Sequence, residues 1–367
     1  MAVDPPPPRL PPAAVVRRTF AVRSRLKRLA DRMLPSSALL AERMFAASEV
    51  KLLGVVCELG VPDQLDGGRR SSADVARELG LDADALERVL RHLASRGWLR
   101  RRRDATYSLN GRSRLLRADD PDSLRDWVRF MAADWHWEMW NRMPAVVSGG
   151  GSAAEAATGK GFFAWVHEDR PDAGTLFDGA MRSLSSLAGP TLARAVDLTG
   201  VRSICDVGGG TGRTLGALLV EAPTARGVVF DLPEVVSGAA EVLDPIAAGR
   251  WESEGGDFFD RLPGGHDRYV LQAVLHDWDD ERCGQILANI RHAMPADGRV
   301  YVMDQVLDPD ERDGLATAVD VLMLALADGG RERTQPEWEE LFTRNGLVIC
   351  GQVQLPILTW VFTLEAV

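Results

Sequence analysis

The sequence predicts an α/β fold in which a helical N-terminal domain precedes a C-terminal domain built on a parallel sheet. The chain has 367 residues, enough for one large domain and a helical partner. Apolar residues recur at helical spacing in the first half, whereas short apolar runs alternate with helical stretches in the second half. Hydrophobic residues make up 46% of the chain, which is sufficient for a sizeable core.

The charge and the cysteines exclude several classes of protein. The formal net charge of −10 and the pI near 5.2 argue against a nucleic-acid partner, because phosphate binding depends on clustered Lys and Arg. The cysteines have neither disulfide-framework nor zinc-ligand spacing, and no apolar run reaches the roughly 18 to 20 residues that cross a bilayer. We therefore expect a cytoplasmic protein with no metal site, no nucleic-acid partner and no membrane partner.

The N-terminal part of the chain is predicted to be a tail followed by helices. Residues 1–28 are Pro-rich and then basic, which favours a flexible, solvated tail. Over residues 34–65 the apolar side chains recur at helical spacing, and a helix is expected to end near Gly60. Residues 29–118 are thus predicted to form an all-helical, winged-helix-like domain.

A helix-turn-helix pattern covers residues 71–100. Ser72 is the expected N-cap of a first helix, Gly80 marks the turn, and Gly97 ends a second helix. The four arginines and the segment ATYSLN that come next fit the wing of a winged helix. Such a module serves DNA-binding regulators, and it also serves as a protein–protein module that packs against a second subunit. We favour the second interpretation, and the first stays open.

Residues 119–190 hold an unusual concentration of aromatic residues and methionines. Trp135 and Phe177 belong to it, and we expect both to line a pocket for an aromatic substrate. Core packing is the alternative for each, because aromatic stripes at helical spacing more often fill a core. Residues 148–161 are predicted to be a loop by composition. The segment as a whole is predicted to be a helical linker that contributes to the substrate pocket.

Residues 191–367 are predicted to form a Rossmann-like domain. The sequence SICDVGGGTGRTLGALL places a strand before Asp206 and a helix after Gly212, with Gly208 and Gly210 in the turn. Glycines let a ligand approach the backbone and allow the unusual dihedrals of such a turn. Arg213 stands where a dinucleotide fingerprint requires Gly or Ala, which argues against a nicotinamide enzyme.

Three more residues follow the next two strands. Asp231 comes 19 residues after Gly212, at the end of the second strand, where its carboxylate is placed to accept both ribose hydroxyls of a cofactor. After the third strand, Asp257 is placed to accept from an adenine amino group, and Phe258 is placed to cover the ring. A surface turn capped by the Asp is the alternative for this segment alone.

His276 follows the fourth strand, at the carboxyl end where doubly wound sheets bind ligands. The helix after it is expected to be capped by Asp279 or Asp280. An isolated His at such a place is more often structural. The motifs around it change this, and a catalytic role becomes the favoured hypothesis.

Five segments, taken together, resemble the family of small-molecule O-methyltransferases that includes plant caffeic acid enzymes and bacterial polyketide-tailoring enzymes. They are DVGGGTG, VVFDLPEVV, GGDFF, VLHDWDDE and GRERTQPEW. The resemblance runs from about Leu34 to the C-terminus in the family's order. It implies a class I methyltransferase domain, an N-terminal dimerisation domain, a homodimer, S-adenosylmethionine as cofactor with S-adenosylhomocysteine as product, and a small phenolic or polyketide-derived acceptor.

The resemblance also implies roles for individual residues. The catalytic base falls on His276 and its supporting acids fall on Asp304 and Glu332, although one of these positions is often Glu in relatives, so the reach of Asp304 is in question. The residues implied for the cofactor are Asp206, Gly208, Gly210, Asp231, Leu232, Asp257, Phe258, Gln272 and Ser185. The residues expected on the acceptor side are Met181, Phe177, Trp135, Met323 and Asp277.

The residue types suit methyl transfer to a hydroxyl without a metal. A phenol has a pKa of about 10 and imidazole one of about 6.5, so a neutral His removes the proton as the methyl carbon is attacked. An acid bonded to the other ring nitrogen fixes the tautomer. No compact acidic cluster indicates the metal-dependent route. A family member with diverged, hydroxylase-like chemistry is the main alternative, and a winged-helix DNA-binding regulator is the other.

Overall fold

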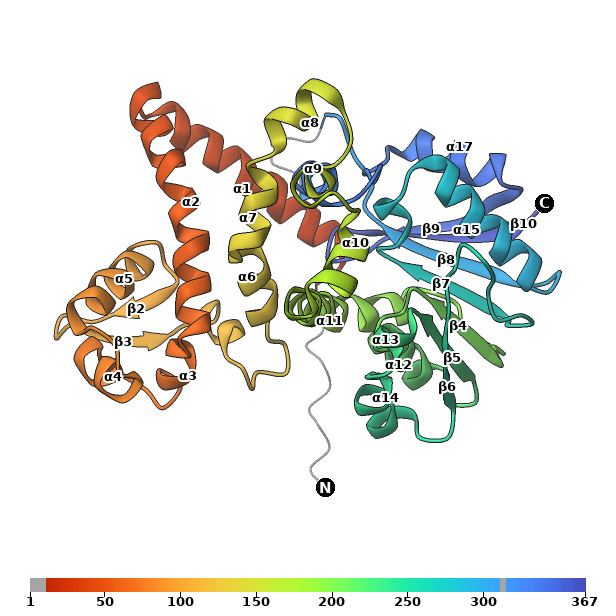
Figure 1. The fold of residues 1–367 in the computed structure, drawn as a ribbon, viewed down its shortest axis with the longest axis horizontal. Helices are drawn as coiled ribbons and strands as arrows, with labels where there is room; N and C mark the ends of the chain where they lie inside the picture. Colours follow the sequence, from red (N-terminus) through yellow and green to blue (C-terminus); the bar gives the residue numbers. More distant parts are fainter. Residues whose placement is uncertain (1–10, 311–314) are drawn as a thin grey trace. The chain divides into compact units, whose positions relative to one another are not determined.

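The computed structural model of the protein describes residues 11–310 and 315–367, which form two compact units (Figure 1). The helical unit is Leu34–Leu187. The sheet unit joins the chain up to Met33 to Ala188–Val367. Each unit has hydrophobic clusters of its own. No helix in the described part of the chain combines the length and the apolar character needed to cross a membrane.

The helical unit opens with the predicted winged-helix module. Its elements are α2 (Ser36–Glu58), α3 (Val61–Gln64), β1 (Arg70–Ser71), α4 (Ser72–Leu79), α5 (Ala83–Ser95), β2 (Leu99–Arg101) and β3 (Thr106–Leu109). The strands form an antiparallel sheet in the order β1-β3-β2, so the wing is present. Ser71, not the predicted Ser72, caps α4 by accepting from the backbone N–H of Asp74. Gly80 takes the left-handed conformation that ends α4.

Eight further elements complete the helical unit. They are η1 (Ser113–Leu116), α6 (Arg125–Ala132), α7 (Asp134–Trp140), α8 (Met143–Gly149), α9 (Ala153–Thr158), α10 (Phe162–Ala164), the π-helical turn η2 (Trp165–Asp169) and α11 (Pro171–Ala193), which runs on into the sheet unit. The predicted loop over residues 148–161 is wrong where α9 forms. Ser152 caps α9, and the buried Ala153 and Ala154 stabilise it.

The sheet unit contains the predicted parallel sheet. Seven strands lie in the order β6-β5-β4-β7-β8-β10-β9. The parallel strands are β4 (Ser203–Val207), β5 (Arg226–Asp231), β6 (Trp251–Gly255), β7 (Arg268–Gln272) and β8 (Arg299–Asp304), and the antiparallel edge is β10 (Trp360–Ala366) and β9 (Leu347–Gln354). The order reverses direction at β4, so the carboxyl ends of β4, β5 and β7 meet at the switch point where such sheets bind ligands.

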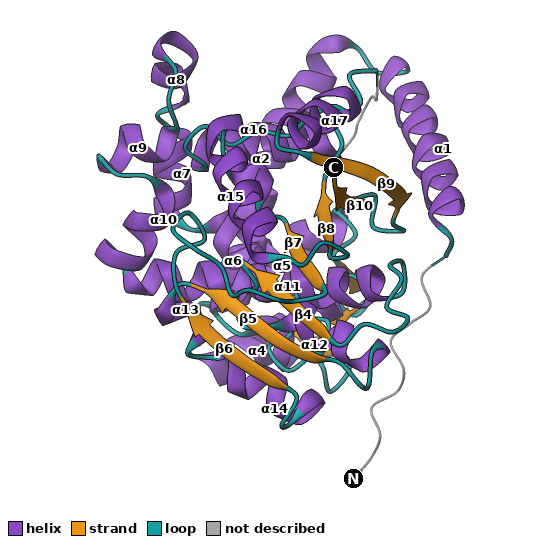
Figure 2. Ribbon diagram, turned by 90° about the vertical axis from the view of Figure 1, so that its right-hand side faces the viewer, coloured by secondary structure: helices purple, strands orange, loops and turns teal. Residues whose placement is uncertain are grey.

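Helices cover both faces of this sheet (Figure 2). They are α12 (Arg213–Glu221), α13 (Pro233–Val236), α14 (Ala239–Ala247), α15 (Asp280–Ala293) and α17 (Gln335–Arg344). The unit also contains α16 (Leu315–Leu326). Successive strand residues point to opposite faces. Val270 therefore joins the cluster under α12 and α14, and Leu271 joins the cluster under α15 and α17. This burial of both faces fixes the register of the strands that end at the site.

The N-terminal segment differs from its prediction. A helix, α1 (Ala13–Arg32), occupies most of the range predicted to be a flexible tail, and Nη1 of Arg17 donates to Oε1 of Gln354 in β9 at 2.8 Å. The prediction is thus wrong for residues 13–28, where Ala, Arg and Leu are good helix formers that outweigh the Pro-rich start. Its part on residues 1–10 lies outside the described residues.

Candidate active site

The glycine turn follows β4 and leaves an open space above its backbone. Gly208, Gly210 and Gly212 have φ of 66°, 60° and 81°, in the left-handed region that side chains rarely adopt. A Cβ on Gly208 would lie 2.9 Å from Cγ2 of Val274, whereas a Cβ on Gly210 would meet nothing within 4 Å. The backbone of Gly210 is therefore accessible to a ligand, as the cofactor motif requires.

Asp231 lies beside this turn at the carboxyl end of β5. Its Oδ2 accepts from the N–H of Gly210 at 2.8 Å, and its Oδ1 accepts from the N–H of Leu232 at 2.7 Å. The half-buried carboxylate thus holds the glycine turn against the neighbouring strand. Its position beside Gly210 fits the predicted contact with a ribose, because Oδ2 lies next to the accessible backbone of the turn.

Asp206 has a different place from the other predicted cofactor residues. It is 1% exposed, and its Oδ2 accepts from the N–H of Leu215 in the first turn of α12. Burial raises its pKa to about 7 against the effect of that hydrogen bond. A Cβ on Gly209 would lie 2.7 Å from its Cγ. Asp206 therefore lies beneath the turn and shapes it.

Phe258 and Gln272 lie around the same turn. A Cβ on Gly208 would lie 3.7 Å from Cε1 of Phe258, and this ring packs edge-on against Phe259 and Trp278. Asp257 accepts from the N–H of Phe259 at 2.8 Å, which is the hydrogen bond of the alternative surface turn. The hydroxyl of Thr214 donates to Oε1 of Gln272. Gln272, at the end of β7, is thereby tied to the start of α12.

His276 lies in the 3₁₀ turn η3 (Leu275–Asp277) among three carboxylates. Its Nδ1 is 2.8 Å from Oε1 of Glu332 and 3.8 Å from Oδ1 of Asp304, and its Nε2 is 3.6 Å from Oδ1 of Asp277. The side chains of Glu332 and Asp304 are fully buried. The structure thus brings the three predicted catalytic residues together, but only Glu332 is within hydrogen-bond distance of the imidazole.

The pKa values of His276 and its neighbouring carboxylates depend on burial and on the excess of acidic over basic side chains. Burial by itself lowers the pKa of His276, but the carboxylates of Asp277, Glu332 and Asp304 outweigh it and raise that pKa to about 10. Burial raises the pKa of Asp304 to about 8 and that of Asp277 to about 6, and the nearby imidazolium reverses only part of each increase.

The carboxylate of Asp304 does not reach the imidazole of His276 with a hydrogen bond. Both carboxylate oxygens of Asp304 are buried without a hydrogen-bond partner, and so is Oε2 of Glu332. Such a group favours the protonated state, because an unpaired buried carboxylate is costly to keep charged. Among the described residues, no set of three or more His, Cys, Asp and Glu is arranged to hold a metal ion.

The predicted acceptor residues come from both units. Trp135, Phe177 and Met181 belong to the helical unit, as does Ser185, which was predicted to contact the cofactor. Met323, buried in α16, and Asp277 belong to the sheet unit. Trp135 and Phe177 both contact Phe130, with ring centroids 5.6 Å and 5.8 Å apart. Both rings therefore belong to an aromatic cluster within the helical unit. This agrees with core packing, the alternative to pocket lining.

Two residues near the base were missed by the sequence analysis. Oδ1 of Asp320 in α16 accepts from the N–H of Glu332 at 2.9 Å. Arg333 is fully buried directly after Glu332. Its position inside the RERT segment was the only available signal, because the partners of its guanidinium hydrogen bonds lie more than 50 residues away.

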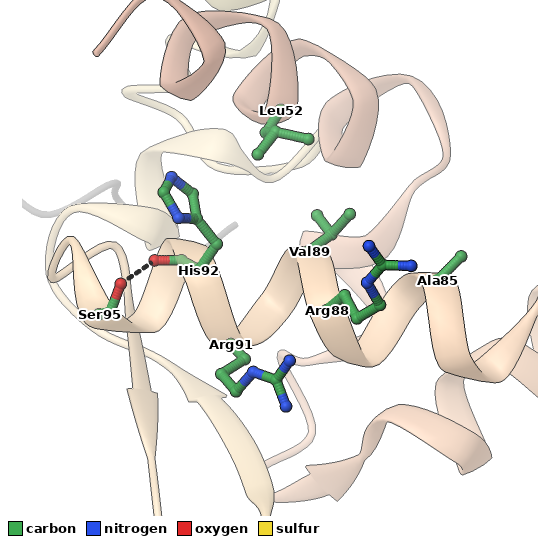
Figure 3. Close-up of a pocket in the computed structure, with 7 residues that line it drawn as sticks. All are labelled: Leu52, Ala85, Arg88, Val89, Arg91, His92 and Ser95. Carbon is green, nitrogen blue, oxygen red and sulfur yellow. Dashed lines mark hydrogen bonds between the residues drawn. The ribbon is translucent and has the colours of Figure 1, made fainter. Parts of the chain in front are cut away.

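A hollow of about 620 Å³ lies on the helical unit, between α2 and α5 (Figure 3). It is lined by Leu52, Ala85, Arg88, Val89, Arg91, His92 and Ser95. None of the predicted site residues lines it. The candidate active site is therefore the group around the glycine turn and His276, which is defined by its side chains and not by this hollow.

Comparison with known proteins shows the family to which the chain belongs. Residues 140–348 match the O-methyltransferase domain, and residues 41–119 match the O-methyltransferase dimerisation domain. The chain is 36% identical over 304 residues to the mitomycin biosynthesis 6-O-methyltransferase of Streptomyces lavendulae, covering 82% of this chain and 86% of that protein. It is 33% identical over 306 residues to the phenazine-1-carboxylate N-methyltransferase of Pseudomonas aeruginosa, covering 83% and 90%.

A solved structure gives the same result at the level of the fold. The crystal structure of CalO1, a methyltransferase in calicheamicin biosynthesis with bound S-adenosylhomocysteine, has a TM-score of 0.80 and 33% identity, covering 90% of this chain and 98% of that one. The predicted fold class, cofactor and enzyme class are thereby confirmed. The chain belongs to the family of S-adenosylmethionine-dependent O-methyltransferases of secondary metabolism.

Proposed function

We propose that this enzyme methylates a hydroxyl of a small aromatic molecule, with His276 as general base and without a metal. The proposal rests on the 2.8 Å contact between Nδ1 of His276 and Oε1 of Glu332. With Nδ1 held as the donor to Glu332, Nε2 is the nitrogen left to take a proton from the acceptor. The base is then oriented in the way that general-base catalysis requires.

The chemistry asks little more of the protein than positioning and proton transfer. When bound, S-adenosylmethionine supplies a methyl group on a cationic sulfur, which departs as a neutral thioether. Nε2 of His276 takes the hydroxyl proton as the acceptor oxygen forms its bond to the methyl carbon. Glu332 stabilises the imidazolium that results. The surrounding carboxylates raise the pKa of His276 above its ordinary value, which makes its neutral imidazole a stronger base toward the hydroxyl proton.

The residues around the glycine turn fit the cofactor. We assign Gly208 and Gly210 to its amino acid end and Asp231 to its ribose, with Leu232 beside it. Phe258, at the edge of the turn, is assigned to the adenine. The fit rests on two observations, the open space over Gly210 and the carboxylate of Asp231 at its border. Gln272, Asp257 and Ser185 complete the proposed set.

An aromatic acceptor is favoured by the composition of the helical unit. Trp135 and Phe177 belong to a cluster of aromatic rings, and Met181 is a half-buried residue of α11 in the same unit. Within the sheet unit, we assign Met323 and Asp277 to the acceptor. The relative from Streptomyces lavendulae bears the name of a mitomycin biosynthesis 6-O-methyltransferase, which agrees with transfer to a hydroxyl of a secondary metabolite.

The N-terminal module is proposed to form a homodimer and not to bind DNA. Residues 41–119 match a dimerisation domain, and this range includes the winged-helix module except the first five residues of α2. On α2, the apolar side chains of Leu40, Met44 and Phe45 are 62%, 66% and 72% exposed. We accordingly assign residues 29–118 to dimerisation, 119–190 to the acceptor pocket and 191–367 to cofactor binding.

Methyl transfer to nitrogen is the second candidate function. A relative that is 33% identical bears the name of an N-methyltransferase. A nitrogen with a free electron pair needs no base to remove a proton before the attack. The paired His276 and Glu332 therefore favour the hydroxyl.

The test is a methyl-transfer assay with a panel of hydroxylated and aminated aromatic compounds. We expect methyl ethers and S-adenosylhomocysteine in equal amounts, in the presence of EDTA. His276→Ala should lower kcat by about 10² to 10⁴-fold and leave calorimetric binding of S-adenosylmethionine intact. His292→Ala, at the exposed end of α15, is the matched control. Wild-type kcat in His276→Ala would contradict the base, and products methylated only on nitrogen would contradict the hydroxyl.

A further inference from the structure

We propose that Arg333 is a positioning residue for the base. In this proposal its guanidinium fixes the turn that carries His276 against the loop that carries Glu332, and so sets the contact between the two. The inference rests on the proposed function, in which His276 removes the proton. Arg333 is fully buried and directly follows Glu332 in the chain.

The guanidinium holds the base's turn at both ends. Nη1 of Arg333 donates to the carbonyl of Leu275 at 3.1 Å, and Nη2 donates to the carbonyl of Trp278 at 2.8 Å. These two carbonyls flank His276 and Asp277. Nε and Nη2 also donate to Oδ1 of Asp280 at 2.9 Å and 2.7 Å. One side chain therefore bonds to the backbone before and after the base and to the helix that follows.

The backbone near Arg333 lies directly on the same turn. The N–H of Arg331 donates to the carbonyl of His276 at 2.8 Å, and Gly329 pairs with Trp278 in an antiparallel bridge. A Cβ on Gly330 would lie 2.8 Å from the carbonyl oxygens of both His276 and Asp277. The loop that carries Glu332 is thus packed directly against the turn that carries His276. The guanidinium of Arg333 extends this contact to Trp278, at the end of the turn.

Arg333 also meets the chain that leaves Asp304. Its carbonyl accepts from the N–H of Leu307 at 2.9 Å, and it forms a parallel bridge with Val306. The guanidinium lies 5.1 Å from the ring centroid of Trp338, whose Nε1 donates to the carbonyl of Gln305 at 2.9 Å. Arg333 therefore contacts all three segments that carry His276, Asp304 and Glu332.

These contacts require an arginine. Its planar fork offers five N–H donors in fixed directions, which reach two carbonyls and a carboxylate at once. The ammonium of a lysine keeps the charge but not the fork, so Arg333→Lys tests the geometry more than the electrostatics. A displacement of the base of about 1 Å is expected to lower the rate on the order of 10²-fold.

The primary experiment compares Arg333→Lys with the wild type in the full-length enzyme. We expect kcat to fall about 10- to 10²-fold, with little change in KM for S-adenosylmethionine. A weaker contact with Glu332 lowers the pKa of His276, so the acid limb of the pH profile should move to lower pH. The low-field NMR signal of the Nδ1 proton should shift as well. A role in folding alone would change neither the pH profile nor this signal.

The matched control is Arg344→Lys. Arg344 contacts the same carboxylate, 3.4 Å from Oδ2 of Asp280, but it is half exposed and bonds to neither flanking carbonyl. This variant should retain the wild-type kcat and pH profile. If it loses as much activity as Arg333→Lys, the effect belongs to Asp280 and the proposal is wrong.

His276→Ala separates this inference from the proposed function. In that background the added Arg333→Lys should change the residual rate by less than about threefold, because residues that act through one group are not additive. If His276→Ala keeps the wild-type rate, the proposed base fails. If His276→Ala is slow while Arg333→Lys keeps the wild-type kcat, pH profile and NMR signal, Arg333 is not a positioning residue.

A second variant covers the case in which Arg333→Lys does not fold. Asp280→Asn removes the charge that pairs with Arg333 at a half-exposed site, which the fold should tolerate. It should lower kcat about 2- to 10-fold by loosening the fork. An unchanged kcat together with an unchanged pH profile would overturn the proposal.

Discussion

Nδ1 of His276 lies within hydrogen-bond distance of Glu332, at 2.8 Å from Oε1. Asp304 is equally buried but stands 3.8 Å from the same nitrogen. The two acids are therefore not equivalent. Glu332 orients the ring, whereas Asp304 lies beside it without a hydrogen bond to it. The variants of the two acids should accordingly differ in kind.

Glu332→Gln should lower kcat by about 10²-fold or more, because an amide oxygen stabilises the imidazolium less and the amide can also hold the wrong tautomer. Steady-state kinetics with saturating S-adenosylmethionine measures this effect. Glu340→Gln, on the exposed side of α17, is the control and should behave as the wild type. Equal rates for the two variants would show that Glu332 has no part in orienting the base.

Asp277→Asn should move the acid limb of the pH profile of kcat/KM to lower pH. The base works in its neutral form. Because the carboxylates raise its pKa to about 10, the activity should fall as the pH drops below about 10. Asp277 is the strongest of the opposing charges, and removing it should lower the pKa of His276 by about one unit or more. An acid limb that stays in place or moves to higher pH would contradict this account.

Asp304→Asn should stabilise the fold while it lowers activity. The pKa of Asp304 is about 8 in the folded protein and near its ordinary 3.8 when unfolded, so the folded state binds this proton more tightly. The resulting loss of stability grows as the pH rises from about 4 to about 8 and is constant above that. We expect a gain of about 1 to 3 kcal/mol in the free energy of unfolding at pH 8.

Thermal or denaturant unfolding at pH 5 and pH 8 checks this prediction. The advantage of Asp304→Asn should be larger at pH 8, and the exposed Asp297→Asn should show no such dependence. An advantage that is equal at both pH values would mean that Asp304 is not protonated in the folded enzyme.

Asp231→Asn should weaken the binding of S-adenosylmethionine and have little effect on the rate of methyl transfer. A charged hydrogen bond contributes about 1.5 to 3 kcal/mol, which corresponds to a rise in KM for S-adenosylmethionine of about 10- to 10²-fold. We expect kcat at saturation to change much less, because Asp231 bonds to the glycine turn and not to His276. Asp260→Asn is the control, because Asp260 is exposed and follows β6, the strand beside β5. A lowered kcat at unchanged KM would contradict the assignment.

Phe45→Asp should convert the proposed homodimer to a monomer. Phe45 is 72% exposed on α2, and a carboxylate there cannot be buried against a second subunit without a large desolvation cost. Light scattering coupled to size exclusion measures the mass. Val220→Asp, at a 59% exposed position of α12, should leave the mass unchanged. A wild-type chain that is already monomeric would remove the proposal.

Much of the fold could be predicted because the sequence marks its turns locally. Gly80 and Gly97 end the helices of the winged-helix module with φ of 68° and 81°, as their positions predicted. The glycine turn and the strands before Asp206 and Asp231 were predictable for the same reason. The error of one residue at the cap of α4 arises because Ser71 and Ser72 are the same residue type, so that only the backbone decides between them.

What could not be predicted depends on contacts between distant parts of the chain. The helix α9 forms where composition indicates a loop, because Ala153 and Ala154 are buried by other elements. The distance of 3.8 Å from Asp304 to the imidazole depends on how β8 stands beside the turn η3. The burial of Arg333 depends on segments more than 50 residues away in the chain. No local pattern carries this information.

The base, its two acids and Arg333 all lie between residues 268 and 338 of the sheet unit, whereas the aromatic cluster with Trp135 lies in Leu34–Leu187. Every contact described for the base is therefore encoded by one short stretch of the gene. An exchange of the helical unit between relatives would leave those contacts unchanged. Recombination of this kind offers an evolving pathway, or an engineer, a way to recruit new acceptors while the proton-transfer machinery is inherited intact.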